Sequence, residues 1–233
     1  MKRQGRLILK YLFMNFYYQV EKFVMEVGKK YDKKDKKILD VGAGEGEYGE
    51  YFKKISYTAC DIKQNKKKTI DMVGDFISDK GKFKKGYYDY VLCTQVLEHF
   101  EDPMVVFQRF NRVLKPGGKL FLTTNFIYQI HMEPNDYFRF TKYGLISLGE
   151  KNGFKVESIK PQGGIFSVLV YVLATLPLRL GLEKKWWSYH LYLVLFSPVI
   201  VLGNLIAVFL DKFDREKKLT INYEVVYVKN GKK

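Results

Sequence analysis

The chain has 233 residues and 47% of them are hydrophobic, so it can bury a full core, and a disordered polypeptide is excluded. Its 40 basic and 25 acidic residues give a formal net charge of +15, which favours polyanionic partners such as anionic lipid headgroups or RNA. Lysine runs at residues 29–34, 66–68 and 80–85 are expected to form separate solvated surfaces rather than one stripe.

Strands and helices are predicted to alternate along the chain, as in a parallel sheet that is covered on both faces. An opening helix is expected over residues 7–27, because apolar residues recur there at helical spacing. Further helices are expected at 104–114 and 141–152. Strands are expected at 37–41, 56–61, 69–73, 88–93, 118–124, 154–160 and 222–229.

The first predicted strand runs directly into a glycine-rich turn at residues 42–46, where bare backbone lets a nucleoside-type ligand approach closely. A dinucleotide fingerprint also matches at Gly44, Gly46 and Gly49, but nearby carboxylates would repel a pyrophosphate. These carboxylates belong to Asp40, Glu45, Glu47 and Glu50. The positively charged S-adenosylmethionine would be attracted instead, and Asp61 at the end of the next strand could bind both ribose hydroxyls.

At these residues the chain resembles the class I S-adenosylmethionine-dependent methyltransferases, in their type 11-like branch. Segments similar to that family's motifs occur in order at 38–46, 57–62, 74–76, 88–99 and 114–120. The resemblance spans about residues 35 to 160, with a last strand at 222–229. It implies an α/β fold: a Rossmann-like, seven-stranded, mostly parallel sheet with helices on both faces and an apolar helical insertion before the last strand. It also implies S-adenosylmethionine as the cofactor.

The resemblance further implies which residues bind that cofactor. The turn residues expected at the methionine end are Asp40, Gly42, Ala43, Gly44 and Gly46. The residues expected at the ribose and adenine are Asp61, Ile62, Asp75 and Phe76. The residues expected to border the sulfonium, where the fourth strand ends, are Thr94, Gln95 and Val96.

Four residues are candidates for catalysis, namely His99, His131, Tyr137 and Arg139. Either histidine could act as a base, although His99 could instead make a structural hydrogen bond. Tyr137 could stack on the acceptor, and Arg139 could bind a carboxylate or phosphate of the acceptor or pair with Asp136 to hold the loop. No Cys/His cluster stands at metal-ligand spacing along the chain, so no metal is expected.

The segment 165–210 departs from the plain methyltransferase pattern, because it contains two long uncharged runs at 165–178 and 188–210. The strands at 154–160 and 222–229 belong to one predicted sheet, so the segment between them would cross a bilayer an even number of times. The first run is short and contains Pro177, and the net positive loop at 179–185 disfavours export across the membrane. We therefore predict two helices that lie in, or dip into, the cytoplasmic leaflet of the membrane. A membrane-spanning hairpin and a buried lid or dimer interface are the alternatives.

The sequence thus predicts an N-terminal helix and basic linker (1–34), a cofactor-binding core (35–164), an apolar membrane-associating insertion (165–210) and a last strand with a basic tail (211–233). The resemblance implies that Cys60 and Cys93 fall on strands separated by the first strand, so no disulfide and a reducing cytosol are expected. The predicted function is methyl transfer to a small, lipid-soluble or membrane-tethered acceptor at the inner face of the membrane. RNA-directed methylation, or non-catalytic binding through the basic surface, is the alternative, and the oligomeric state stays open.

Overall fold

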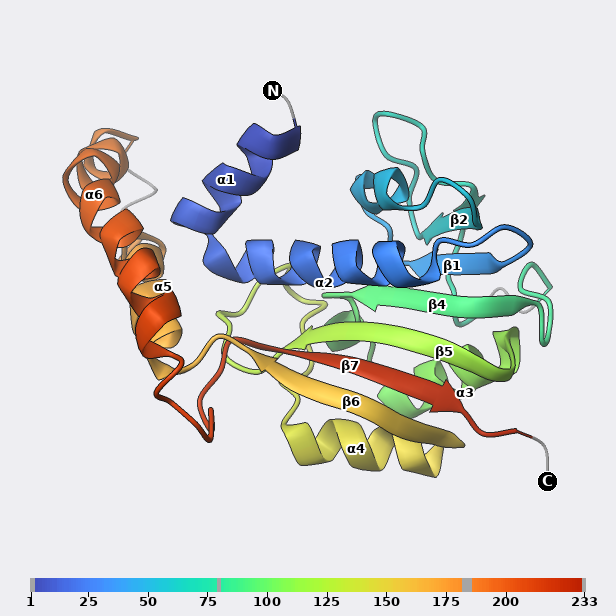
Figure 1. Cartoon of the computed structure of the whole chain (residues 1–233). Helices are drawn as coiled ribbons and strands as arrows, with labels where there is room; N and C mark the ends of the chain where they lie inside the picture. Colours follow the sequence, from blue (N-terminus) through green and yellow to red (C-terminus); the bar gives the residue numbers. More distant parts are fainter. Residues whose placement is uncertain (1–2, 79–80, 182–185, 232–233) are drawn as a thin grey trace. The chain divides into compact units, whose positions relative to one another are not determined.

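The computed structural model describes residues 3–78, 81–181 and 186–231 (Figure 1). The helices are α1 (Arg3–Phe13), α2 (Asn15–Tyr31), α3 (Pro103–Val113), α4 (Lys142–Lys151), α5 (Ile165–Arg179) and α6 (Trp186–Leu210), with short 3₁₀ helices η1 (Glu47–Tyr51) and η2 (Leu97–His99). The strands are β1 (Lys37–Val41), β2 (Ser56–Asp61), β3 (Met72–Val73), β4 (Tyr88–Thr94), β5 (Leu114–Asn125), β6 (Phe154–Gln162) and β7 (Asn222–Lys229). Two compact units divide the chain: Met1–Glu21 with Pro161–Asn222, and Lys22–Lys160 with Tyr223–Lys233.

The sheet has seven strands in the order β3-β2-β1-β4-β5-β7-β6. Neighbouring strands from β3 to β5 pair in parallel, with Leu39 of β1 opposite Thr58 on one side and Val91 on the other. The arrows of β4 and β7 point in opposite directions in Figure 1. This arrangement confirms the predicted seven-stranded, mostly parallel Rossmann-like sheet. Because the strand order reverses at β1, the carboxyl ends of β1, β2 and β4 surround a crevice suited to a ligand.

Alternate residues of the central strands pack against different helices, because successive side chains of a strand point to opposite faces. One buried cluster joins α3 and α4 to the sheet through Leu39, Val91, Cys93, Leu120, Val106, Phe107, Phe110 and Leu145. The other joins α2 to the opposite face through Phe23, Val24, Val27, Ile38, Leu92 and Phe121. Cys60 and Cys93 both align with Val41, one on each side of β1, and both thiols are free and buried.

The predicted opening helix at 7–27 is two helices, with a break at Met14, and the second continues to Tyr31. The break lets α1 fold back, so that Lys10 and Arg6 pair with Glu21 at 2.7 and 3.2 Å. In one straight helix, residues 10 and 21 would stand about 16 Å apart along the axis. The apolar periodicity continues through the break, so the pattern alone could not locate it.

Helices α5 and α6 run antiparallel and are tied together at one end by two aspartates. The Asp211 carboxylate accepts hydrogen bonds from the Gly164 and Phe166 amides, at 2.8 and 3.0 Å, and from the Ser167 hydroxyl at 2.5 Å. Asp214 accepts from the Ile165 amide at 2.9 Å. These carboxylates satisfy the amides that the first turn of α5 leaves without helical partners. The start of α5 is therefore held beside the end of α6.

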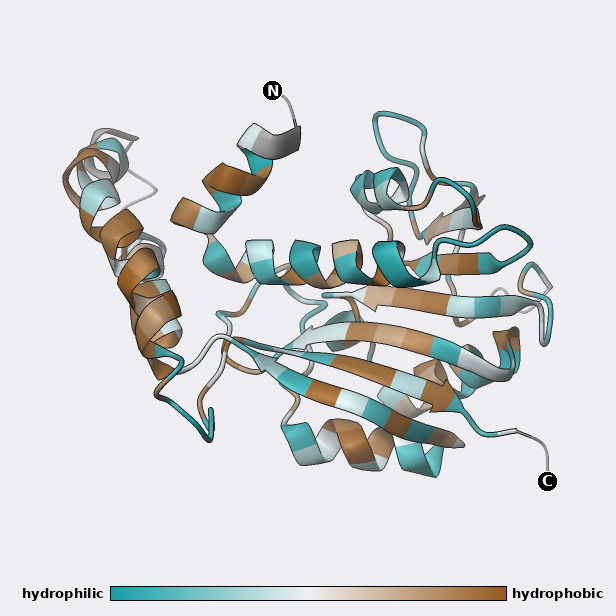
Figure 2. Ribbon diagram, in the orientation of Figure 1, coloured by the Kyte–Doolittle hydropathy of each residue, from teal (hydrophilic) through white to brown (hydrophobic). Residues whose placement is uncertain are grey.

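Helix α6 is apolar along most of its length (Figure 2). Its covered side carries Tyr192, Ile200, Asn204 and Ala207 at helical spacing, and Asn204 donates a hydrogen bond to the Leu12 carbonyl of α1 at 2.6 Å. We call the other side the apolar face of α6. It consists of the exposed residues Leu191, Val194, Leu195, Val199, Leu202, Leu205, Ile206 and Phe209. Across the residues described here, no helix is both long and apolar enough to cross a membrane.

Candidate active site

A cleft of about 550 Å³ opens at the carboxyl ends of β1, β2 and β4. Nine of the twelve predicted cofactor residues line it: Gly42, Gly44, Asp61, Ile62, Asp75, Phe76, Thr94, Gln95 and Val96. The sequence reasoning missed six further lining residues: Val41, Cys60, Gly74, Phe100, Met132 and Asn135. Three of these adjoin predicted cofactor residues in the sequence, at 41, 60 and 74, so extending each cofactor motif by one position would have found them.

The glycine turn after β1 leaves bare backbone facing the cleft. Gly42 and Gly44 have φ angles of +74° and +53°, which favour glycine over any residue with a Cβ. A Cβ added at Gly44 would meet nothing within 4 Å, whereas one at Gly42 would overlap the Val96 side chain. A ligand can therefore approach the backbone of Gly44 directly, and Val96 packs against Gly42 because no side chain stands there.

Asp61 stands at the end of β2, lines the cleft and also fixes the turn. Its Oδ2 accepts a hydrogen bond from the Gly44 amide at 2.8 Å, and its Oδ1 accepts from the Lys63 amide at 3.3 Å. The carboxylate therefore already links the two segments that meet at the cleft. A carboxylate has enough lone pairs to accept further hydrogen bonds from two ribose hydroxyls.

Three predicted cofactor residues do not line the cleft, namely Asp40, Ala43 and Gly46. Asp40 precedes Val41 on β1, and since adjacent side chains of a strand alternate, it points away from the face that Val41 presents to the cleft. Ala43 is buried, and a Cβ at Gly46 would overlap Thr69. These three residues therefore contribute to the conformation of the turn and do not line the cleft.

Asp40 is fully buried, and the Tyr57 hydroxyl donates a hydrogen bond to its Oδ2. Its Oδ1 is buried without a hydrogen-bond partner among the described residues. Burial raises the pKa of Asp40 to about 7; the hydrogen bond from Tyr57 opposes the rise, and the charge of Asp61 adds to it. The Asp40 carboxyl therefore titrates near neutral pH.

The predicted adenine end of the cleft is built on the turn after β3. The Asp75 carboxylate accepts from the Ile77 amide at 2.9 Å and the Ser78 amide at 3.3 Å. Burial alone would raise the pKa of Asp75, but these hydrogen bonds hold it below its ordinary value. Phe76 is only 3% exposed, and its ring packs edge-on against Phe83 at 5.0 Å between centroids. Its ring therefore borders the cleft from the core.

The residues after β4 form another wall of the cleft. Gln95 has a φ angle of +55°, which is uncommon for a residue with a side chain and is concentrated at functional sites. Its amide donates to the Thr123 carbonyl at 2.9 Å, and its side-chain Nε2 donates to the Thr123 hydroxyl at 3.1 Å. These two bonds to β5 hold the strained residue in place.

Arg139 is engaged within the connection after β5. Its Nη1 and Nη2 each donate to Asp136 at 2.7 Å in a bidentate pair, and Nη2 and Nε also donate to the Gln129 and Tyr128 carbonyls. The hydrogen bonds from Arg139 keep the pKa of Asp136 well below its usual range. Of the two roles predicted for Arg139, this geometry supports holding the loop.

His99 is the one predicted catalytic residue that lines the cleft, and its Nδ1 lies 2.6 Å from the Asn135 carbonyl oxygen. The His131 ring stands edge-on to the His99 ring at 4.7 Å, with its Nδ1 3.1 Å from Asp136. Burial lowers the pKa of His131, although the charge of Asp136 opposes this. Tyr137 lines an adjoining pocket of about 320 Å³ and hydrogen-bonds to Glu101 and Asn135.

Glu98, beside His99 on η2, is fully buried. Its carboxylate accepts hydrogen bonds from the Thr124 hydroxyl at 2.8 Å and the Asn125 side-chain amide at 2.6 Å. Burial raises the pKa of Glu98 above its ordinary value, and the hydrogen bonds oppose that rise. Its backbone oxygen accepts from the Tyr137 amide at 2.9 Å, which anchors the connection after β5 to η2.

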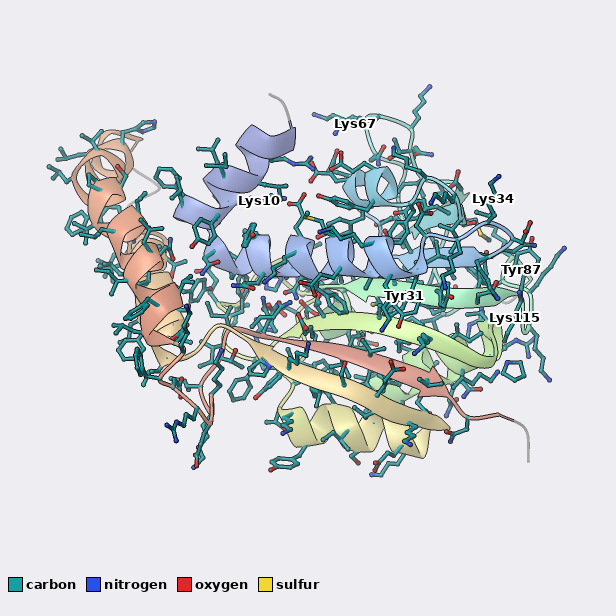
Figure 3. The ribbon with its side chains drawn as sticks, in the orientation of Figure 1. Lys10, Tyr31, Lys34, Lys67, Tyr87 and Lys115 are labelled. Carbon is teal, nitrogen blue, oxygen red and sulfur yellow. The ribbon has the colours of Figure 1, made fainter. Side chains whose placement is uncertain are left out.

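Several basic side chains gather at the other end of the sheet, where β1, β4 and β5 begin. Figure 3 shows Lys34, Tyr87 and Lys115 at this end. Lys36 and Lys115 pair with Asp89 at 3.0 and 2.8 Å. The cleft lies at the carboxyl ends of the same strands, so these lysines are not part of the cleft wall.

An open glycine turn, an acid that ends the second strand and a cleft at the reversal of strand order define a nucleoside-binding α/β protein. A family model described as "Methyltransferase domain" matches residues 11–159. The chain belongs to this methyltransferase family, and its fold is that of the class I S-adenosylmethionine-dependent enzymes. This confirms the predicted family and fold class.

One relative is the ubiquinone biosynthesis O-methyltransferase of Xanthomonas oryzae pv. oryzae, which is 34% identical over 101 residues, covering 38% of this chain and 42% of the relative. The chain thus matches less than half the length of that relative. A solved S-adenosylmethionine-dependent methyltransferase of Archaeoglobus fulgidus is similar over 97% of this chain and 99% of its own, with a TM-score of 0.59 and 16% identity. Phosphoethanolamine N-methyltransferase 2 of Haemonchus contortus, solved with S-adenosylmethionine, covers 89% of this chain and 52% of its own, with a TM-score of 0.54 and 17% identity.

Proposed function

We propose that the protein transfers the methyl group of S-adenosylmethionine to a hydroxyl oxygen of a small, lipid-soluble or membrane-tethered acceptor. The observation that carries the proposal is the acid-lined cleft with its open glycine turn, in a chain of the methyltransferase family. No lysine or arginine lines the cleft among the described residues, and Asp61 and Asp75 both do. Such a wall suits a cationic nucleoside and opposes a phosphate.

The residues of the cleft fit S-adenosylmethionine part by part. The backbone at Gly42 and Gly44 would hold the methionine end, Asp61 the ribose hydroxyls, and Asp75 the adenine edge. When bound, S-adenosylmethionine supplies an electrophilic methyl group on a sulfonium. The protein's main task is then to hold an acceptor oxygen in line with the C–S bond, about 3 Å from the methyl carbon, and to exclude other groups.

The acceptor side of the cleft is formed by His99, Met132 and Asn135. As the new C–O bond forms and the C–S bond breaks, the hydroxyl proton must leave. A carbonyl oxygen can only accept, so His99 donates from Nδ1 to Asn135 and keeps a lone pair on Nε2. That nitrogen can accept the proton within the cleft.

A relative that is named for O-methylation in ubiquinone biosynthesis supports an oxygen acceptor on a lipid-soluble molecule. The apolar face of α6 supports a membrane location for the same reaction. A surface helix in water normally carries polar residues on its open side, whereas Val194 and Leu202 of this face are 72% and 58% exposed. The chain has a formal net charge of +15, which attracts it to anionic lipid headgroups. We therefore infer that an anionic bilayer surface covers this face.

The reaction is tested by incubating the full chain with methyl-labelled S-adenosylmethionine and with lipid, polar and RNA extracts, followed by mass spectrometry. We expect label on oxygen in the lipid fraction, and less label with Asp61→Asn when S-adenosylmethionine is limiting. Asp35→Asn removes an exposed carboxylate before β1 and should behave like wild type. Label in RNA alone would favour the RNA-directed alternative. Cofactor binding without label in any fraction would favour a non-catalytic role.

Membrane association is tested by flotation with vesicles that contain anionic lipid. Burial of each leucine stabilises binding by about 1.5–3 kcal/mol, so Leu195→Asp with Leu202→Asp should reduce the floating fraction at least 10-fold. Tyr143→Asp on α4, at a side chain that is 77% exposed, is the matched control and should still float. The alternative is a dimer interface. It would be identified if the wild-type chain did not float, sedimented as a dimer, and became a monomer with the double substitution.

A further inference from the structure

We propose that Glu98, His99 and His131 form a binding site for one divalent transition-metal cation, best matched to zinc, at the acceptor side of the cleft. A donor atom from each of the three side chains lies within 4.8 Å of the others. Two of the residues come from η2 and the third from the connection after β5, so only the fold brings them together. The role of the cation in catalysis rests on the proposed function, whereas its binding does not.

The contact of His99 with a backbone carbonyl is of the kind made by metal-binding histidines. Its Nδ1 lies 2.6 Å from the Asn135 carbonyl oxygen, which can only accept, so the ring proton is on Nδ1. Neutral imidazole then has its lone pair on Nε2. A metal-binding histidine usually donates its other ring N–H to a carbonyl or carboxylate in this way, which fixes the tautomer and the ring orientation.

His131 is oriented by the same kind of contact. Its Nδ1 lies 3.1 Å from Asp136 Oδ2 and 3.2 Å from the Gln129 carbonyl oxygen, both of which are acceptors. The proton is therefore on Nδ1 and the lone pair on Nε2. Arg139 in turn holds Asp136 by two bonds of 2.7 Å. This chain from arginine to aspartate to histidine gives Arg139 and Asp136 a purpose as positioning residues behind a ligand.

Glu98 supplies the third ligand from a buried position. Its two carboxylate oxygens accept from Thr124 and Asn125, which orient the carboxylate without neutralising its charge. Ligating carboxylates are commonly hydrogen-bonded in this manner, and a buried carboxylate is stabilised by a nearby cation. The three proposed ligands thus each have a partner that fixes their direction.

Two imidazoles and one carboxylate select the kind of ion. Imidazole nitrogens suit zinc and its transition-metal neighbours, whereas magnesium prefers six oxygen ligands in strict octahedral geometry. Three protein ligands also leave a coordination position open, as in catalytic zinc sites. Because His99 lines the cleft, we infer that the open position receives the acceptor hydroxyl. The cation would then occupy the lone pair of His99, so the hydroxyl proton leaves to water in the metal-bound enzyme and to His99 only in the metal-free enzyme.

The test uses the full chain without a histidine tag, stripped of metal by chelation and titrated with Co²⁺ and Zn²⁺ in the absence of S-adenosylmethionine. We expect saturable 1:1 binding of Zn²⁺ by calorimetry and visible absorption bands from bound Co²⁺. Mg²⁺ should compete at least 100-fold more weakly. His131→Ala and His99→Ala should each weaken Co²⁺ binding at least 10-fold.

His190→Ala is the matched control, because His190 is the third histidine of the chain and lies on α6. It should leave Co²⁺ binding unchanged. His131 does not line the cleft, so His131→Ala should bind S-adenosylhomocysteine with an affinity within 3-fold of wild type. This measurement checks that the variant is folded. Absence of 1:1 binding, or equal weakening in His190→Ala, would overturn the metal site. Metal binding without cofactor binding would instead contradict the proposed function.

Discussion

Replacement of Asp61 by alanine is expected to weaken S-adenosylmethionine binding 10- to 100-fold, the largest loss expected from a single carboxylate of the cleft. Asp61 lines the cleft and accepts from the Gly44 amide at 2.8 Å, so the change removes both a ligand contact and a brace of the turn. Loss of a pair of charge-assisted hydrogen bonds corresponds to about 1–3 kcal/mol. Titration calorimetry with S-adenosylhomocysteine, which lacks the reactive methyl group, measures the effect without turnover.

Two further variants separate the loss of the contact with the ligand from the loss of the hydrogen bond that holds the glycine turn. Asp61→Asn keeps an oxygen that can accept from Gly44 but removes the charge, so we expect an intermediate loss of affinity with little change in the melting temperature. Asp35→Asn, at an exposed position before β1, should bind like wild type. An unchanged affinity in Asp61→Ala would mean that the ribose assignment is wrong.

The cleft was predictable where the sequence carries the geometry in one contiguous stretch. A strand that ends in glycines must turn there, so Gly42 and Gly44 could be placed at the site from the chain alone. Asp61 and Thr94, which the resemblance to the methyltransferases placed at the cofactor, line the cleft because the carboxyl ends of neighbouring parallel strands meet at one edge of the sheet. The same resemblance placed Asp40 there, but the alternation along β1 turns its side chain away from the cleft.

The cluster of Glu98, His99 and His131 could not be predicted from spacing, because its third member comes from a connection whose path the sequence does not set. The bonds from Arg139 to Asp136 and to the Tyr128 and Gln129 carbonyls hold that connection together. The Tyr137 amide, which donates to the Glu98 carbonyl, holds it against η2. The expectation of no metal rested on linear spacing alone, and it takes no account of ligands that the fold brings together. The break at Met14 was invisible for a related reason, since both helices keep the same apolar periodicity.

Asp40 should make the stability of the protein fall as the pH rises through neutrality. Burial raises its pKa in the folded state to about 7, above a value near 3.9 in the unfolded chain. Between these two pH values the folded state binds one more proton, on Asp40, than the unfolded state does. The contribution of this proton to stability is therefore complete below about pH 4 and is lost as the pH rises through 7. From pH 5 to pH 8, we expect a loss of about 2–3 kcal/mol in the free energy of unfolding.

Asp40→Asn removes the titrating group, so urea unfolding of this variant should lack that loss between pH 5 and pH 8. Tyr57→Phe removes the hydrogen bond that lowers the pKa of Asp40, so the fall in stability should move to higher pH.

Asp32 is expected to show the opposite pH dependence. Burial alone would raise its pKa, but bonds from the amides of residues 53–55 hold it below its ordinary value. Its contribution is present above the unfolded pKa, so Asp32→Asn should lower stability equally at pH 5 and pH 8. Parallel curves for wild type and Asp40→Asn would show that Asp40 is ionised throughout this range, and its buried carboxylate would then need a compensating positive charge.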